Sequence, residues 1–153
     1  MTNNKDFILS VMREQGRKNA LDLRSRAADM TGTEIIAEES NIPTYDNNKD
    51  YTGWAVGSPC LFDGQVYGLL QPYNAANHPD TTPADLPALW RVMHTTNPAD
   101  AKPYVKPTST SDMYLTGECM LYTDGVVYFS LRDTVYSPEE YAADWEAVTD
   151  ELP

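Results

Sequence analysis

One short pattern of aromatic residues, glycines and valines occurs twice in this chain of 153 residues. In each copy an aromatic residue stands three positions before a glycine, an Asp-Gly pair follows between two apolar runs, and a tryptophan closes the unit. The first copy extends from Trp54 to Trp90 and the second from Tyr114 to Trp145. A repeat of this length predicts two structural units, each too small to form a secure core without a neighbour.

Each copy also carries the sequence signature of a β-hairpin. The pairs Asp63-Gly64 and Asp124-Gly125 lie between short apolar runs, which is a strong signal for a tight hairpin turn. We therefore expect an α+β chain, with an N-terminal helical segment followed by two small three-stranded antiparallel β modules. The modules are expected at residues 45–94 and 113–150, with an ordered, extended connector at residues 95–112.

A helix is expected before the repeat, over residues 5–30. Its apolar and small side chains recur every three or four positions and form one stripe: Ile8, Met12, Gly16, Ala20, Leu23, Ala27 and Met30. We expect this stripe to anchor the chain, within residues 1–42, by docking on another subunit in a homo-oligomer or on a different partner protein; the alternative is packing on its own chain. Gly32 is expected to end this helix, and Thr33 to cap a second short helix that ends near Ser40.

The charge of the chain excludes some partners. It has 11 Lys and Arg residues against 23 Asp and Glu, a net charge of −12, and residues 42–153 hold five basic and sixteen acidic residues. Nucleic acid and anionic membranes attract clustered basic residues, so neither is expected as a partner. We find no apolar run long enough to span a membrane and no signal peptide, so we expect synthesis in the cytoplasm.

No motif for catalysis or cofactor binding is present, and we expect a protein that is not an enzyme and binds no cofactor. Composition alone leaves a carboxylate pair for glycoside hydrolysis open, although nothing marks one pair. Residues 46–50 have the oxygen spacing of a calcium loop, but Tyr51 and Gly57 replace its diagnostic glycine and glutamate, so no metal is expected. Cys60 and Cys119 are expected to be small buried side chains; a disulfide between the modules is the alternative.

Aromatic side chains are the remaining candidates for binding. The chain has 10 Tyr and 3 Trp against 3 Phe, and four aromatics of the shared pattern are expected in the cores: Trp90, Trp145, Tyr67 and Tyr128. The tyrosines outside the pattern, Tyr51, Tyr73 and Tyr136, are expected at the surface, where they could stack on sugar rings. Asp133 is expected to accept hydrogen bonds from sugar hydroxyls.

The repeated unit resembles the small carbohydrate-binding modules of the type 5/12 chitin-binding superfamily. The resemblance covers residues 51–93 and 114–148 and rests on paired scaffold positions: Trp54 or Tyr114, Gly57 or Gly117, Gly64 or Gly125, Tyr67 or Tyr128, and Trp90 or Trp145. It implies compact three-stranded β units. The exposed aromatic pair of chitin-binding members is missing from the corresponding stretches, residues 71–74 and 132–135.

The whole chain is similar to small proteins encoded in structural gene clusters of bacteriophages and prophages of Gram-positive bacteria. The similarity rests on these segments: 33–36, 42–43, 64–67, 71–72, 88–90, 94–95, 98–103 and 110–114. It implies a virion component, and we expect a protein of the tail, baseplate or fibre with other virion proteins as partners; the partner protein of the helical stripe would then belong to the tail or baseplate. The expectation that the modules bind host surface glycans rests on the placement of the aromatic residues. A structural connector or capsid decoration protein without sugar binding is the alternative, and a cell-wall-binding accessory of a lysis enzyme is a third.

Overall fold

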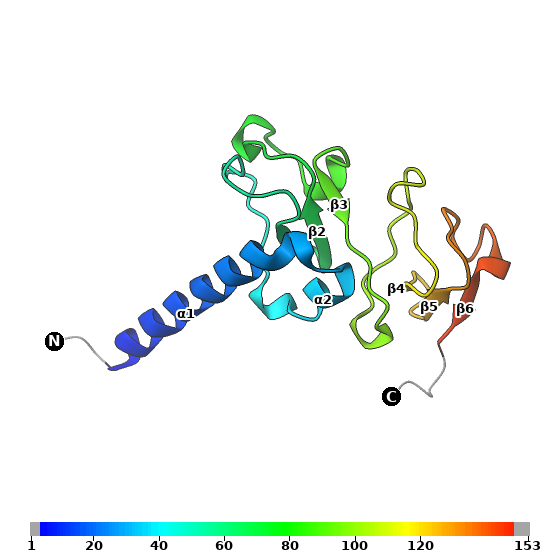
Figure 1. Ribbon diagram of the computed structural model, residues 1–153, viewed down its shortest axis with the longest axis horizontal. Coiled ribbons are helices and arrows are strands. Elements are labelled where there is room, and N and C mark those ends of the chain that lie inside the picture. Colours follow the sequence, from blue (N-terminus) through cyan, green and yellow to red (C-terminus); the bar gives the residue numbers. More distant parts are fainter. Residues whose placement is uncertain (1–3, 149–153) are drawn as a thin grey trace.

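A computed structural model describes residues 4–148 of the chain. Helix α1 (Asn4–Arg26) extends away from the rest of the molecule, and two small sheets follow it in line (Figure 1). The α+β class, the N-terminal helix and the two three-stranded antiparallel sheets are therefore confirmed. The outer ends of the expected segments, residues 1–3 and 149–150, lie outside the described residues.

Only the end of α1 packs on the body of the protein. Leu23 and Ala27 are buried with Ile36 and Val66 in an aliphatic cluster that also contains Ile35 and Ile42. A 3-10 turn (Ala27–Asp29) continues the chain beyond the α-helix. The expected stripe is thus divided, because its C-terminal part covers the first module while its N-terminal part lies beyond the reach of that module.

Helix α2 (Gly32–Ile36) begins earlier than expected, and the assignment of Gly32 and Thr33 as caps is wrong. The Thr31 hydroxyl accepts a hydrogen bond from the Glu34 amide at 3.1 Å, and the Glu34 carboxylate accepts one from the Thr31 amide at 3.0 Å. This reciprocal pair satisfies two amides that no helical carbonyl can reach, so Thr31 is the N-cap. The helix ends at Ile36, and a separate 3-10 turn (Glu39–Asn41) follows it.

The first sheet contains β1 (Pro59–Phe62), β2 (Gln65–Leu69) and β3 (Trp90–Val92), in that spatial order. Phe62 pairs with Gln65, which leaves a two-residue turn at Asp63 and Gly64. Their φ values are 50° and 76°. This is the positive-φ hairpin turn that the Asp-Gly pair predicts, and its twist matches that of the strands it joins.

The second sheet contains β4 (Cys119–Leu121), β5 (Val127–Ser130) and β6 (Trp145–Ala147), also in sequence order. Its hairpin has a longer turn, because Leu121 pairs with Val127 and the Gly125 amide donates to the Tyr122 carbonyl at 3.0 Å. Gly125 alone takes a positive φ in this turn, at 81°. The two hairpins therefore differ in the length of the turn, although the strands follow the same order in both sheets.

An additional edge segment pairs in parallel with the first strand of each sheet. Thr44 forms a bridge with Leu61, and Pro103 forms the matching bridge with Leu121. The Tyr104 amide then donates to the Leu121 carbonyl at 2.8 Å. Part of the segment expected as a connector, residues 95–112, therefore pairs directly with the second sheet.

The two modules contact each other through several polar and aromatic contacts. The His94 ring stacks on Tyr114 with 3.8 Å between ring centroids, and His94 Nδ1 lies 3.1 Å from the Glu118 carboxylate. The side-chain amide nitrogen of Gln65 donates to the Pro103 carbonyl at 2.7 Å. These contacts fix the second module against the first.

Candidate functional site

Matching aromatic clusters fill the two modules. The first aromatic cluster consists of Tyr45, Tyr51, Phe62 and Trp90, and the second consists of Tyr104, Tyr114, Tyr122 and Trp145. In both, a stacked tyrosine pair meets the closing tryptophan edge-on, with 5.3 Å between Tyr51 and Trp90 and 5.3 Å between Tyr114 and Trp145. The repeat therefore specifies one core arrangement twice.

The structural counterpart of Tyr114 is Tyr51, and its alignment with Trp54 is wrong. The Tyr51 amide donates to the Tyr73 carbonyl at 2.8 Å, and the Tyr114 amide makes the same bond to Thr134 at 3.1 Å. The longer segment between Tyr51 and its glycine misaligns the two sequences. Trp54 instead packs on Tyr51 and lies 4.3 Å from the Arg24 guanidinium carbon of α1.

Two expected ligand-binding tyrosines are buried, and their expected surface position is wrong. Tyr51 is 0 % and Tyr73 is 7 % exposed. The Tyr73 hydroxyl accepts a hydrogen bond from the Trp90 indole nitrogen at 2.7 Å and lies 3.2 Å from the Tyr45 hydroxyl. Tyr73 is drawn inward because the buried indole N–H needs an acceptor and the tyrosine ring fills the space beside it.

In the second module, a different acceptor satisfies the indole N–H of the closing tryptophan. Thr134 stands where the first module has Tyr73, and the Trp145 indole nitrogen donates to the Tyr136 carbonyl at 2.9 Å instead. Thr134 also lines a hollow of about 330 Å³, together with Arg132, Asp133, Tyr136, Tyr141, Asp144 and other residues.

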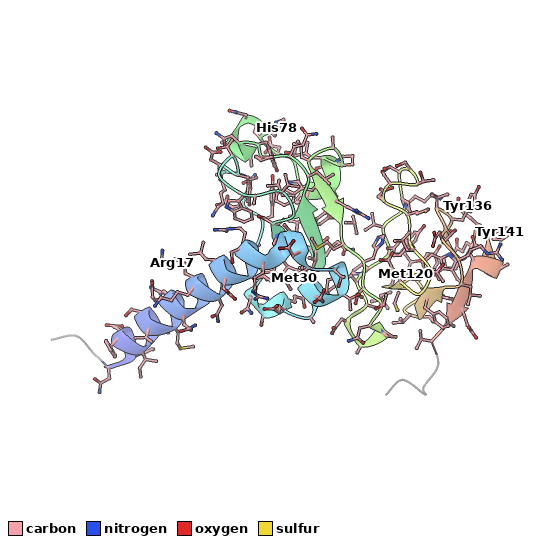
Figure 2. The ribbon with its side chains drawn as sticks, viewed as in Figure 1. Arg17, Met30, His78, Met120, Tyr136 and Tyr141 are labelled. Carbon is pink, nitrogen blue, oxygen red and sulfur yellow. The ribbon has the colours of Figure 1, made fainter. Side chains whose placement is uncertain are left out.

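An exposed tyrosine pair borders this hollow. Tyr136 is 50 % and Tyr141 is 49 % exposed, with 6.2 Å between ring centroids and 43° between ring planes. Both lie at the end of the second module that is farthest from α1 (Figure 2). Tyr136 was expected at the surface and is exposed. Sequence reasoning missed Tyr141, although it follows the helical turn signalled by Ser137 and Pro138.

Charged side chains hold the loop that carries the tyrosine pair. The Lys106 ammonium donates to the Val135 carbonyl at 2.9 Å and to Glu140 at 2.5 Å, and it lies 5.6 Å from the Tyr136 ring centroid. The hydrogen bond from Lys106 and the one from the Ser137 amide hold the pKa of Glu140 below its usual value. The loop is therefore tied to the edge segment of the second sheet.

Two carboxylates lie beside the tyrosine pair. Asp133 is exposed, and its Oδ1 accepts hydrogen bonds from the Thr116 amide and hydroxyl at 2.8 and 3.0 Å. Asp144 is buried; its Oδ2 accepts from the Thr134 hydroxyl at 2.7 Å, while its Oδ1 lies 2.8 Å from Arg132 Nε without accepting a hydrogen bond. Asp144 thus presents a buried acceptor that the exposed Arg132 side chain approaches.

Most of the side chains that were expected in the cores of the two modules are buried. Trp90, Trp145 and Tyr67 are buried as expected. Tyr128 packs against the second core but is only half-buried, because its hydroxyl reaches outward and donates to Asp124 at 2.7 Å; its expected core position is confirmed only in part. Cys60 and Cys119 are free and buried, which confirms the expectation and rules out the disulfide.

The expected anchor stripe is mostly open toward its N-terminus. Ile8 and Met12 are 55 % and 63 % exposed, and a Cβ on Gly16 would have no atom within 4 Å. Ala20 and Met30 are half-buried. The described residues contain no group of three metal-binding side chains, and no described helix has the length and apolar character needed to cross a membrane.

No protein-family model matches the chain, and no curated protein sequence matches it.

Proposed function

We propose that this chain is a non-enzymatic bacteriophage virion protein of the tail, baseplate or fibre, and that its second module binds a host surface glycan. The observation that carries the binding proposal is the exposed tyrosine pair, Tyr136 and Tyr141, beside a hollow that is also lined by Arg132, Asp133 and Asp144. The assignment to the virion rests on the whole-chain resemblance to phage structural proteins. The three-stranded sheets with closing tryptophans support modules of the chitin-binding type.

The tyrosine pair suits a sugar because a pyranose ring has C–H faces that pack on aromatic rings, while its hydroxyls need polar partners at the edges. Asp133 and Arg132 supply an acceptor and a donor beside the rings. The Arg132 side chain is 61 % exposed and can move aside, which would give a sugar hydroxyl access to Asp144 Oδ1. A water-exposed platform of this size predicts weak binding per site, strengthened by many copies on one particle.

Only the second module is expected to bind. The corresponding tyrosine of the first module, Tyr73, is buried and hydrogen-bonded to the core tryptophan. The first module therefore supports the second module and the base of α1, and each chain carries one site.

Retention on purified Gram-positive cell walls and on insoluble chitin tests this proposal. The full chain should be retained, and Tyr136→Ala and Tyr141→Ala should each reduce retention about tenfold or more, because each removes one stacking surface. Val56→Ala is the matched control, since Val56 is 55 % exposed and lies in the first module. Equal retention of both tyrosine variants and the parent, or no retention of the parent, would refute the proposal.

A structural connector or capsid decoration protein is the second candidate, favoured by the exposed apolar side chains at the start of α1. In that case the chain copurifies with virions but is not retained on any glycan. Copurification with a lysis enzyme in place of virions would instead indicate a lysin accessory.

A further inference from the structure

The second module is strongly acidic, and the hollow beside its tyrosine pair shares that charge. Residues 113–148 hold one basic and seven acidic residues, a net charge of −6, and the basic residue is Arg132. The charged side chains that line the hollow are Arg132, Asp133 and Asp144, so the hollow has a net charge of −1. A field of this sign attracts cations and repels anions. The charge therefore bears on which glycans the module admits.

Asp144 offers the hollow a buried acceptor that the chain does not satisfy. Its side chain is 5 % exposed and lines the hollow, and its Oδ1 accepts no hydrogen bond from the described residues. Arg132 Nε lies 2.8 Å from this oxygen, but its N–H is not directed at it. A buried carboxylate oxygen without a hydrogen bond costs free energy, which a well-placed donor recovers. A donor that carries positive charge fits this oxygen best.

Arg132 shows which kind of group the hollow takes, because it lies against both surfaces that a ligand would use. Its guanidinium carbon is 5.9 Å from the Tyr141 ring centroid, while its Nε is beside Asp144. An aromatic face and a carboxylate are the two surfaces that attract an organic cation. The Arg132 side chain is 61 % exposed, so an exposed ion pair is all that a ligand must break to displace it into solvent.

The other nearby cation does not oppose a positively charged ligand. Lys106 lies over the Tyr136 ring but is not among the residues that line the hollow. Its ammonium donates to Glu140 at 2.5 Å, so its charge is compensated within the loop. Asp133, in contrast, lines the hollow and accepts the two hydrogen bonds from Thr116 at Oδ1 alone. Its Oδ2 therefore adds a second acceptor for a cation.

We propose that the second module selects sugars that carry a free amine. The sugar ring lies on the tyrosine pair, and its ammonium takes the place of the Arg132 guanidinium beside Asp144 and Tyr141. An ammonium is compact and has three rotatable N–H donors, so it reaches Asp144 Oδ1 where the flat guanidinium does not. An N-acetylated sugar has a neutral amide at this place and gains no charge attraction. The inference rests on the proposed glycan binding and adds the class of sugar that is bound.

Calorimetric titration of the full chain with two oligomers of equal length tests this selectivity. One is an oligomer of glucosamine, at a pH where its amines are protonated, and the other is an oligomer of N-acetylglucosamine. The glucosamine oligomer should bind about tenfold more tightly, because it gains a charge-assisted hydrogen bond to a buried carboxylate. The difference should shrink at high salt. Equal binding of the two, tighter binding of the acetylated oligomer, or binding of neither overturns the inference.

Two carboxylate variants separate this site from general attraction of a polycation to an acidic chain. Asp144→Asn should abolish the preference for glucosamine, because asparagine keeps an oxygen for the Thr134 hydroxyl but carries no charge. Glu146→Gln is the matched control, since Glu146 is exposed, lies two positions further along the chain and does not line the hollow; it should keep the preference. Equal effects of both variants, or full glucosamine binding by Tyr141→Ala, would show general attraction and overturn the inference.

Arg132→Gln supplies a test that does not disturb the core, because this side chain is exposed. It removes the competing cation, so glucosamine oligomers should bind about threefold more tightly, whereas acetylated oligomers should not. Unchanged or weaker binding of glucosamine by this variant overturns the displacement. Failure of cell walls to retain the parent refutes glycan binding as a whole, whereas retention together with equal binding of both oligomers overturns only the choice of sugar.

Discussion

Gly32→Ala tests how the first module, α2 and the second module are joined. Alanine normally stabilises a helix relative to glycine, and Gly32 is the first residue of α2. Here a Cβ on residue 32 would lie 2.3 Å from the His94 carbonyl oxygen and 3.3 Å from the His94 amide nitrogen. Because both are backbone atoms, the contact can be relieved only by moving the chain.

The expected net effect is a loss of about 2 kcal/mol in the free energy of unfolding. The gain in helix propensity is about 1 kcal/mol. Overpacking of this kind costs about 1–3 kcal/mol. Displacing His94 further weakens its contact with Glu118 and its stacking on Tyr114, which adds about 1 kcal/mol. For a chain of this length the melting temperature should fall by about 4–8 °C.

Urea unfolding followed by tryptophan fluorescence measures this difference. Gly53→Ala is the matched control, because a Cβ on Gly53 would have no atom within 4 Å and its φ is not positive, and its stability should change by less than about 0.5 kcal/mol. A Gly32→Ala protein as stable as the parent, or more stable, would refute the argument. It would show that α2 does not press against the end of the first module at His94.

Two further predictions concern ionisable groups. The Cys60 and Cys119 thiols should react with a thiol reagent at about pH 8 only after unfolding, because both are buried and burial raises the pKa of Cys119 to about 11; rapid labelling of the native protein would contradict this. The Lys106 hydrogen bond lowers the pKa of Glu140 below 4.5, so its contribution to stability is present above that pH and is lost as the pH falls through the folded-state pKa. Glu140→Gln should therefore be less stable than the parent at about pH 7, with the difference shrinking toward about pH 3; a constant difference would exclude the ion pair as its cause.

Local signals predicted the secondary structure of the repeat well. Asp63-Gly64 and Asp124-Gly125 mark turns because few residues adopt positive φ without strain, and this restriction acts within a few residues of chain. The three-or-four spacing of apolar residues in 5–30 predicted α1, because the helical repeat is also a local property of the chain. The N-cap was misplaced because Thr31 and Thr33 are equally suitable by type, and only the reciprocal bond with Glu34 selects Thr31.

The candidate site was predicted less well, because exposure depends on residues distant in the sequence. Tyr73 and Tyr136 both follow a hairpin, yet the Trp90 indole draws Tyr73 inward while Trp145 donates to a backbone carbonyl and leaves the Tyr136 side chain outside. Tyr141 became a candidate only through its position 6.2 Å from Tyr136. No spacing rule in the sequence distinguishes these cases.

The sequence by itself determined the helix, the two hairpins and the buried tryptophan that closes each module, because turn chemistry and hydrophobic periodicity act over short stretches of chain. The tertiary structure decided which aromatic side chains are left for a ligand and which part of α1 is left for a partner. Burial is a property of the whole packed chain: Leu23 lies against Val66 and is covered, whereas Met12, about three turns away on the same stripe, lies beyond the body and is exposed.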